Sequence, residues 1–329
     1  MEKIGPFLRQ AGIGALSLHE LGTGGNNRVF RVESERGRFA LKHYFSHPGD
    51  RRDRCGAEVE FLRHLERAGV EDVPKVLAVH ANDRLALFTW VEGQRPTAVS
   101  AEQVSQAGRL FSRMNRARES ARTLPLASEA SFSIVDALEL VARRLGSLMS
   151  LSRANALDRE AANLADEMTG LWPAVKARAY QQAGEAGLDP DEEVHASQRC
   201  LSPSDFGFHN ALQTQAGELR FVDFEYAGWD DPAKMAADFF CQPEVAVSMD
   251  FWDVFMAEAF TEFADAANIT ARARILLPAF QLRWCAIALN LFQPVSLARR
   301  QFSRPALEED QSKQRQLKIA QSLFQRTAV

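Results

Sequence analysis

Three oxygen-bearing side chains stand close together in the middle of the chain. Asp205 and Asn210 are five positions apart in "SPSDFGFHN", and Asp223 follows in the apolar frame "FVDFEY". A hairpin pattern between Asn210 and Asp223 puts the three at the ends of neighbouring strands. Carboxylate and amide oxygens suit a hard cation such as Mg²⁺, and such a site needs few protein ligands when phosphate oxygens supply others. Phosphoryl transfer is the chemistry that uses this set.

The N-terminal part of the sequence offers a clamp for phosphate. The segment "LGTGGNN" at 21–27 is a glycine turn between strand-like segments, and its backbone amides can approach phosphate closely. Lys42 follows among apolar neighbours in "FALKHY", where a lysine needs a partner. Glu58 in the next helical segment is the predicted partner. Glu60 is the rival, but the spacing of the leucines on that helix leaves Glu60 on a different face.

The elements that must position these groups differ between the two parts of the chain. Residues 15–91 predict a small sheet with one helix that ends near Gly69. Four segments of this part are short and rich in β-branched or aromatic residues, as strands are: 28–32, 38–44, 75–79 and 85–91.

Beyond "VEGQRP" the pattern becomes helical. Leucines and other apolar residues recur at helical offsets over 134–171, which predicts two antiparallel amphipathic helices joined near 150–156. The polar segment 183–197 predicts a loop, and a β-hairpin and further helices follow it.

Composition bounds the class of protein. A chain of 329 residues with 46% hydrophobic and 25% charged residues predicts a globular protein of two lobes or domains. The net charge of −4 gives no basic field, so we expect no nucleic-acid partner. Four scattered cysteines fit reduced thiols, and the N-terminus has no pattern of a signal peptide, so we expect a cytoplasmic location. The apolar segment 275–292 carries polar residues and predicts a buried helix, so we expect no membrane partner.

In their order along the chain, these motifs resemble the aminoglycoside phosphotransferase and choline kinase family, small-molecule kinases with a protein-kinase-like fold. The resemblance runs from the glycine turn through Lys42, Glu58 and "FTWVEG" to Asp205, Asn210 and "VDFEYAGWDDPAKMAADFF". It implies an α+β fold of two lobes. Residues 1–91 would form a nucleotide-binding lobe with an antiparallel sheet and one main helix. Residues 92–329 would form a mostly helical lobe with the catalytic loop, the metal site and the acceptor pocket.

The resemblance also implies roles for single residues. Asp205 would be the catalytic residue that accepts the proton of a substrate hydroxyl, and Asn210 and Asp223 would hold Mg²⁺ on the phosphates of ATP. Lys42 would contact those phosphates, with Glu58 fixing it. The other residues implied to bind nucleotide are Gly24, Gly25 and Asn27 of the glycine turn, and Thr89 and Val91, whose backbones would contact adenine.

The sequence departs from the family pattern in two places. Pro203 and Ser204 stand where family members have His-Gly before the catalytic aspartate, so another group must brace the catalytic loop. We interpret His209 as a structural residue that takes over this bracing and not as a base. The glycine turn is also one residue shorter than the common pattern.

Several features carry a simpler interpretation beside the chemical one. Asp205 and Asn210 are also turn-forming residue types, and the glycine turn is also typical of a plain hairpin. Glu225, Trp229 and Asp230 suit a cationic substrate, but charge runs are usually solvated. Arg299 and Arg300 suit either an anionic substrate or solvent, and we favour solvent.

The function predicted from these patterns is transfer of the γ-phosphate of ATP, with Mg²⁺, to a hydroxyl group of a small molecule such as an amino alcohol, a sugar or an aminoglycoside. The missing His-Gly motivates one alternative, a catalytically weak or inactive nucleotide-binding pseudokinase. A protein kinase is disfavoured, because the 8 positions from Asp223 to the helix start at Asp231 leave no room for a long activation loop.

Overall fold

Short segments rich in β-branched and aromatic residues form the N-terminal sheet, as the sequence predicts. The structure is a computed structural model and describes residues 3–22, 25–50, 52–305 and 307–327. In this described part, five antiparallel strands form one sheet in the spatial order β1-β2-β3-β5-β4. Their bounds are β1 (Ala15–Glu20), β2 (Arg28–Ser34), β3 (Gly37–His43), β4 (Val76–His80) and β5 (Leu85–Thr89).

Two helices accompany this sheet. The short α1 (Ile4–Gln10), which the sequence did not predict, packs Phe7 and Leu8 against a small core of the sheet. The predicted helix is α2 (Arg54–Arg67), whose first turn is capped by the Asp53 side chain through the Gly56 amide at 3.0 Å. It ends before Gly69, which adopts the left-handed backbone conformation that favours glycine.

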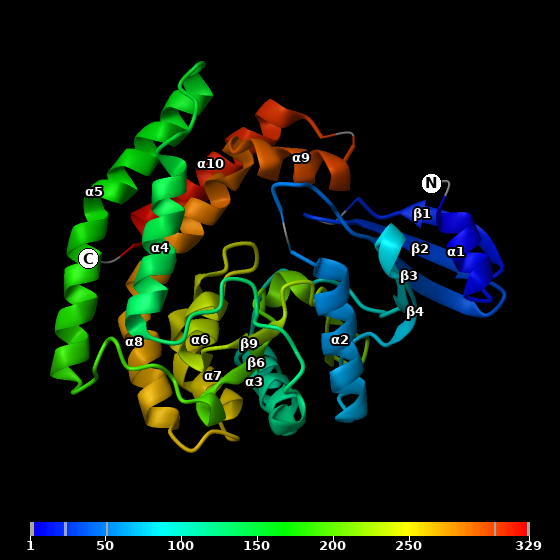
Figure 1. The fold of residues 1–329 in the computed structure, drawn as a ribbon, viewed down its shortest axis with the longest axis horizontal. Coiled ribbons are helices and arrows are strands. Elements are labelled where there is room, and N and C mark those ends of the chain that lie inside the picture. The colour runs from blue at the N-terminus through cyan, green and yellow to red at the C-terminus, as the bar shows by residue number, and fades with distance from the viewer. Residues whose placement is uncertain (1–2, 23–24, 51, 306, 328–329) are drawn as a thin grey trace.

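Helices dominate the rest of the described chain (Figure 1). The predicted boundary after Val91 lies two residues beyond the end of β5, and the division into 1–91 and 92–329 stays a prediction. The helices longer than one turn are α3 (Ala101–Asn115), α4 (Ile134–Leu148), α5 (Ala156–Glu185), α6 (Pro232–Cys241), α7 (Trp252–Ala259), α8 (Ala266–Ala288), α9 (Pro294–Ser303) and α10 (Glu309–Gln325).

The predicted helix pair is present, but its second member is longer than expected. Helices α4 and α5 lie side by side, and α5 continues through Glu185 into the segment 183–197, which we had predicted as a loop (Figure 1). Val175, Ala179 and Ala183 are the buried residues of this extension. Two of these three are alanines, which carry little hydrophobic signal, and so the pattern was missed.

The segment that carries Asp205 and Asn210 lies between two small sheets. Strand β6 (Cys200–Ser202) pairs with β9 (Gly228–Asp230), and β7 (Ala211–Gln213) pairs with β8 (Leu219–Phe221). The second pair is the predicted hairpin, which is confirmed. Asp205 of the segment after β6 and Asp223 of the segment after β8 line the same cavity.

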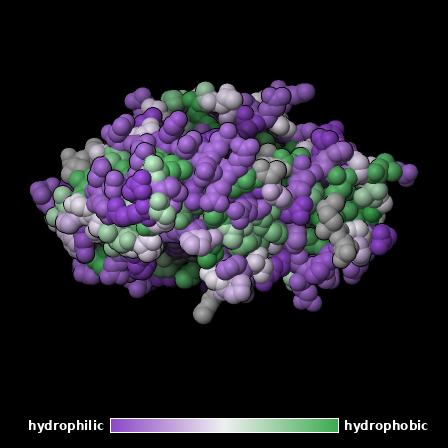
Figure 2. Space-filling view, turned by 90° about the horizontal axis from the view of Figure 1, so that it is seen from above, coloured by the Kyte–Doolittle hydropathy of each residue, from purple (hydrophilic) through white to green (hydrophobic). Residues whose placement is uncertain are grey.

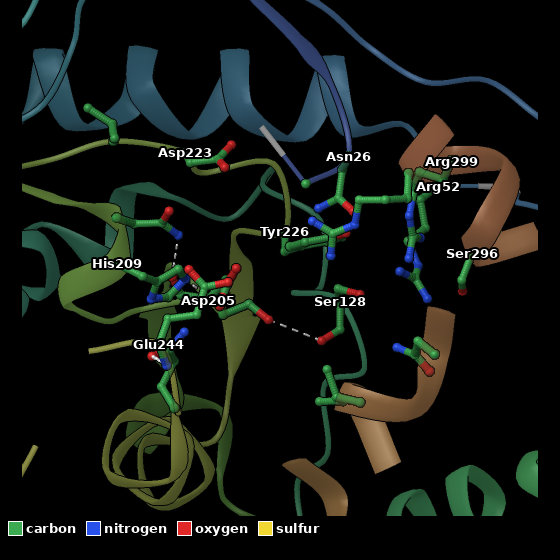
Figure 3. Close-up of a pocket in the computed structure, with 18 of the residues that line it drawn as sticks. Asn26, Arg52, Ser128, Asp205, His209, Asp223, Tyr226, Glu244, Ser296 and Arg299 are labelled. Atoms are coloured by element: carbon green, nitrogen blue, oxygen red, sulfur yellow. Dashed lines mark hydrogen bonds and ion pairs between the residues drawn. The ribbon is translucent and has the colours of Figure 1, made fainter. Parts of the chain in front are cut away.

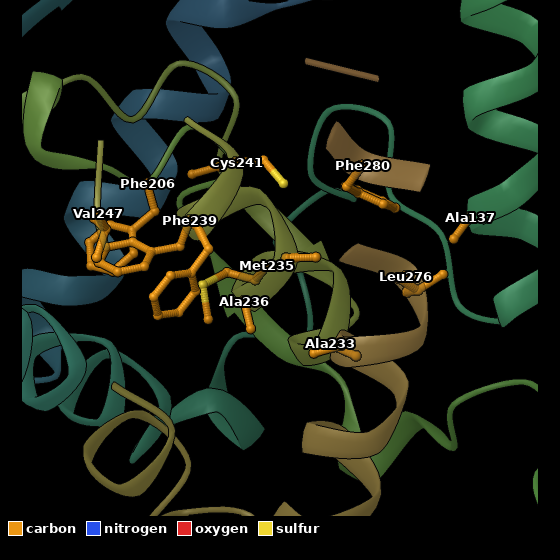
Figure 4. Close-up of a cluster of buried hydrophobic side chains, with 14 of the residues drawn as sticks. Ala137, Phe206, Ala233, Met235, Ala236, Phe239, Cys241, Val247, Leu276 and Phe280 are labelled. Carbon is orange, nitrogen blue, oxygen red and sulfur yellow. The ribbon is translucent and has the colours of Figure 1, made fainter. Parts of the chain in front are cut away.

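Aromatic packing anchors the loop between β6 and β7. Phe206 and Phe208 are buried and contact Phe221 of the hairpin, with Phe206 at a ring distance of 4.7 Å. Phe239 of α6 closes the cluster from below, next to Phe206 (Figure 4). The loop between β6 and β7 is irregular and ends in a turn of 3-10 helix at Phe208–Asn210, and the two buried rings hold that loop against the core.

The most apolar helix lies inside the fold. The segment from α8 to the following turn, 266–292, is long and apolar enough to cross a membrane, but 67% of its most apolar window is buried. This confirms the predicted buried helix. One face of the molecule, in Figure 2, carries mostly hydrophilic side chains, with apolar ones in small scattered groups.

Candidate active site

A buried ion pair stands at the inner edge of the N-terminal sheet. The Lys42 ammonium on β3 donates to both carboxylate oxygens of Glu58 on α2, at 2.7 and 2.9 Å. The Tyr44 hydroxyl donates to the same carboxylate at 2.7 Å. The predicted pairing of Lys42 with Glu58 is therefore confirmed, while Glu60 lies on the exposed face and pairs with Arg63 at 3.0 Å.

The same lysine also reaches the helical part of the chain. Lys42 Nζ lies 2.7 Å from Asp223 Oδ1, and the backbone amide of Phe224 donates to Glu58 at 3.1 Å. Burial opposes the charge of Lys42, but the carboxylates of Asp223 and Glu58 outweigh it and raise the lysine pKa. Lys42 therefore stays protonated where it lines the cavity.

The catalytic loop folds around Asp205. The Asn210 side-chain amide donates to the Asp205 carbonyl oxygen at 3.0 Å and so closes the loop. His209 Nε2 lies 3.1 Å from Asp205 Oδ1. His209 thus contacts the carboxylate directly, in a loop that lacks the histidine of the family pattern.

Charge and burial oppose each other in the Asp205–His209 pair. Burial alone raises the pKa of Asp205, but the His209 charge and the hydrogen bonds from His209 and Asn210 outweigh it and lower that pKa. Burial likewise opposes the charged form of His209, but Asp205 raises the pKa of His209 above its ordinary value. Both effects keep Asp205 ionised, as a proton acceptor must be.

Two residues of the site adopt a backbone conformation that side chains disfavour. Ser204 has φ of 65° and Asp223 has φ of 72°, both in the left-handed region. Ser204 stands where the family pattern has glycine, which adopts this conformation without strain. The Ser204 amide donates to the Ser202 hydroxyl oxygen at 2.9 Å, and the Ser204 hydroxyl donates to the Ser128 carbonyl oxygen at 3.3 Å. Such strained residues concentrate at functional sites.

Asn210 and Asp223 fit the role of magnesium ligands by their chemistry. Both line one cavity together with Lys42 and Asp205, and both carry hard oxygen donors. The Asn210 amide nitrogen is engaged with Asp205, which leaves the side-chain oxygen as its donor to a metal. The described residues hold no group of three or more His, Cys, Asp or Glu suited to a metal, so a magnesium ion at these two residues would need phosphate and water oxygens as its other ligands.

The glycine turn is tied to the helical part by a buried carboxylate. Glu225 accepts one hydrogen bond from the Asn26 amide and one from the Asn27 amide, each at 2.5 Å. The Asn27 side-chain oxygen also accepts a hydrogen bond from the Phe45 amide at 3.3 Å, so Asn27 ties the glycine turn to the segment after β3. Gly25 lines the cavity, whereas Gly24 lies outside the described residues.

The predicted adenine edge is only partly free for hydrogen bonding. The backbone amide of Thr89 donates to the Lys75 carbonyl oxygen at 3.0 Å, which removes that amide as a contact for adenine. Among the described residues, none forms a backbone hydrogen bond with Val91, which lines the cavity. Ala40 and Leu212 supply apolar walls nearby in the same lining.

The three residues predicted to bind a cationic substrate are not brought to the cavity. Glu225 is buried and engaged with the glycine turn. Asp230 is fully buried and binds Lys234 at 2.6 Å, because a carboxylate without water needs an internal cation. The Trp229 indole donates to the Ala121 carbonyl oxygen at 3.1 Å. None of these three lines the cavity described here.

Sequence analysis missed a second group of charged residues at this site. Glu129 binds Arg144 at 2.5 Å and Arg283 at 2.7 Å, and all three line the cavity. The cavity has a volume of about 1120 Å³. Sites for one drug-sized ligand have roughly 300–1,000 Å³, so this one has room for two substrates. No local period in the sequence brings Glu129 to residues of two distant helices.

Comparison with known proteins agrees with the family resemblance seen in the sequence. The model of the phosphotransferase enzyme family matches residues 17–279, and the chain belongs to that family. The predicted resemblance, the kinase-like fold and the class of enzyme, a phosphotransferase, are confirmed. No curated protein sequence matches the chain significantly.

Solved structures of similar fold cover nearly the whole chain. A choline kinase from Cryptosporidium parvum Iowa II is 13% identical, with a TM-score of 0.59, over 98% of this chain and 99% of that one. The spectinomycin phosphotransferase APH(9)-Ia, in complex with ADP and spectinomycin, is 13% identical, with a TM-score of 0.60 over 98% of each chain. A macrolide 2'-phosphotransferase from Brachybacterium faecium is 15% identical, with a TM-score of 0.56, over 94% of this chain and 100% of that one.

Proposed function

We propose that the protein transfers the γ-phosphate of Mg²⁺-bound ATP to a hydroxyl group of a small molecule. The observation that carries this proposal is the convergence of Lys42, Asp223, Asn210 and Asp205 on one cavity between the sheet and the helices. Family membership makes the chain a phosphotransferase. Structures of similar fold were solved with ADP or AMP, which supports nucleotide as the donor.

In this proposal Asp205 is the proton acceptor. The acceptor hydroxyl oxygen forms a bond to the γ-phosphorus while the bond from that phosphorus to the bridging oxygen of ADP breaks. The hydroxyl proton passes to the Asp205 carboxylate, which stays ionised because His209 and Asn210 lower its pKa. The electron pair of the broken bond stays on the bridging oxygen, and ADP leaves as the anion.

The other residues hold the donor in place. Lys42, fixed by Glu58, offsets negative charge on the phosphates, and Gly25 lets the backbone approach them. Asn210 and Asp223 would hold the magnesium ion, which spreads the charge that develops on the phosphate oxygens. Val91 would contact adenine at the hinge.

The inactive pseudokinase is not supported by the catalytic loop. That alternative was motivated by the missing His-Gly, but His209 contacts Asp205 at 3.1 Å and supplies a brace from the other side of the loop. The proposal also places the enzyme in the cytoplasm, where its four buried free cysteines stay reduced.

The experiment that tests the function is a coupled assay of ADP release over amino alcohols, sugars and aminoglycosides. We expect one class of acceptor to raise ADP release above the rate with ATP alone. Asp205→Asn should lower that turnover by roughly two to four orders of magnitude, with ATP binding retained. Nucleotide-induced stabilisation without turnover on any acceptor would restore the pseudokinase.

A further inference from the structure

One face of α9 presents arginines to the cavity. Ser296, Arg299 and Arg300 are spaced by three and four positions, share one side of the helix and line the cavity. The helix is held against the glycine turn: the Ser303 hydroxyl donates to the Gly25 carbonyl oxygen at 3.2 Å, and the Phe302 ring packs on the sheet. The arginines are thus carried by a fixed element and are not on a loose surface loop.

The charges of these arginines are not fully balanced by neighbouring carboxylates. Arg299 lies 3.5 Å from Asp50, but Asp50 is bound more closely by Arg54 at 2.6 Å. Arg300 has no carboxylate within ion-pair distance among the described residues, although it is half-buried. Burial lowers the pKa of Arg300 most, the charges of Arg304 and Arg299 lower it further, and the charge of Glu244 opposes them only in part. Like charges gathered out of water are unfavourable unless an anion joins them.

A third arginine completes the group from the N-terminal side. Arg52 lies over the Tyr226 ring at 5.7 Å, and its Nε is 4.0 Å from the shared Asp50. Figure 3 shows Arg52 and Arg299 facing the same part of the cavity, with Ser296 beside them. We call Arg52, Arg299 and Arg300 the arginine group.

The acids of this cavity do not offset the arginine group. Among the described lining residues, nine are arginine or lysine and six are aspartate or glutamate, so cations prevail. Glu129, on the wall near α4 and α8, is already bound by two arginines. Glu244 lies close to His209 and Asp205 in Figure 3, and its charge raises the pKa of both His209 and Arg300, so this one acid is shared between the two sides of the cavity. Beside the arginine group a cationic acceptor would meet more arginines than carboxylates.

The arginine group and the catalytic carboxylate face each other. In Figure 3, Asp205 and His209 lie on one side of the cavity, Arg52 and Arg299 lie on the other, and Ser128 is between them. An acceptor with its hydroxyl at Asp205 would extend its far end toward the arginines. Lys42 and the proposed magnesium ligands already serve the donor phosphates.

We propose that the acceptor is an anion, a hydroxyl compound that also carries a phosphate or carboxylate group, and that Arg52, Arg299 and Arg300 bind this group. The inference rests on the proposed function and adds the substrate class. It revises the solvated interpretation of Arg299 and Arg300 drawn from the sequence. It also differs from the cationic acceptor suggested by Glu225, Trp229 and Asp230, which do not line the cavity.

The first test compares acceptors that differ by one anionic group. ADP release would be measured with glucose against glucose 6-phosphate, glycerol against glycerol 3-phosphate, and sorbitol against gluconate, with choline and an aminoglycoside as cations. We expect at least one anionic member to be used about 10-fold better than its neutral partner, and the phosphate and carboxylate pairs tell the two groups apart. Better use of a neutral or cationic acceptor overturns the inference while it leaves the phosphotransferase proposal intact.

The second test changes the arginines. Arg300→Gln should raise the KM of the anionic acceptor about 10- to 100-fold, with Arg300→Lys in between and the KM of ATP unchanged. Arg63→Gln, on the exposed face of α2, is the matched control and should alter neither constant. If Arg300→Gln raises only the KM of ATP, the arginine serves the donor and the inference is wrong.

A binding measurement keeps the inference testable without an acceptor. With Mg²⁺ and a non-hydrolysable ATP analogue bound, sulfate should raise the melting temperature more than chloride at equal ionic strength. In the Arg299→Gln, Arg300→Gln double variant this extra rise should shrink to the general effect that sulfate has on any protein, whereas in Arg63→Gln it should stay as large as in the wild type. An equal rise in all three proteins overturns the inference. Stabilisation by the analogue alone tests the nucleotide site separately.

Discussion

Lys42 and Asp223 form a direct ion pair of 2.7 Å, although 181 positions separate them in the sequence. Glu58 joins the same ammonium from α2. The sheet and the helical part of the chain are therefore tied together at the point where the proposed donor phosphates bind. The pair places one fixed cation beside one proposed magnesium ligand.

Lys42→Met tests how much this ion pair contributes to the stability of the fold. The substitution leaves Glu58 buried without its cation, although the Tyr44 hydroxyl and the Phe224 amide still donate to it. We expect the free energy of unfolding to fall by about 3 kcal/mol, because breaking a buried pair leaves an uncompensated charge. Urea denaturation measures this. Lys75→Met, at an exposed lysine, is the control. A loss no larger than that of the control contradicts the assignment.

His209→Gln tests whether His209 keeps Asp205 ionised. In the wild type the lowered pKa of Asp205 makes its stability contribution present above about pH 4 and lost as the pH falls further. Without the imidazolium, burial still raises the pKa of Asp205, so the acid limb of kcat/KM should move to higher pH. The pH profile of ADP release measures this, with the exposed His19→Gln as control. An unmoved acid limb would mean that His209 has only a packing role.

Ser204 allows a test of backbone strain. Ser204→Ala keeps the left-handed strain and loses the hydrogen bond to Ser128, whereas Ser204→Gly loses that bond but relieves the strain. Strain of this kind amounts to about 1–2 kcal/mol, part of which is offset by the greater freedom of glycine in the unfolded chain. The glycine variant should therefore be more stable than the alanine variant by roughly 0.5–1 kcal/mol. The reverse order in urea denaturation would remove the strain argument.

Glu129 should make the stability of the protein depend on pH. Burial raises its pKa, but the charges of Arg283 and Arg144 outweigh burial and hold the pKa well below the usual 4.5. Its contribution is therefore present above that value and lost as the pH falls through the folded-state pKa. Glu129→Gln should lower the free energy of unfolding by a few kcal/mol at pH 7, and the gap to wild type should shrink in acid.

The control for this prediction lies on α4. Glu139→Gln removes a carboxylate from an exposed position, 3.8 Å from Arg143, and should change stability little at any pH. A gap between wild type and Glu129→Gln that stays constant from neutral to acid pH contradicts the role of the ion pairs.

Sequence analysis found the parts of the site that leave a local signal. A lone lysine in an apolar strand and a glutamate on one helix face were enough to predict the pairing of Lys42 with Glu58. The hairpin pattern after Asn210 was enough to place β7 and β8. The types and spacing of Asp205, Asn210 and Asp223 were enough to predict that these three residues lie together, and all three line one cavity.

Contacts between distant segments left no such signal. The hydrogen bonds from Asn26 and Asn27 to Glu225 span almost 200 positions, and no sequence pattern in either segment predicts them. Glu225 was therefore assigned to substrate. The arginines of α9 look like solvated charges in the sequence, because only the packing of that helix on the glycine turn brings them to the cavity.

Magnesium-dependent nucleotide binding tests the central proposal most directly. Isothermal titration calorimetry of ATP, with and without Mg²⁺, should give tight binding to the wild type only when the metal is present. Asp223→Ala should lose this dependence on magnesium, because Asn210 alone remains as a protein ligand. Equal magnesium dependence in wild type and Asp223→Ala would contradict the convergence of Lys42, Asp223 and Asn210 on one metal-bound triphosphate.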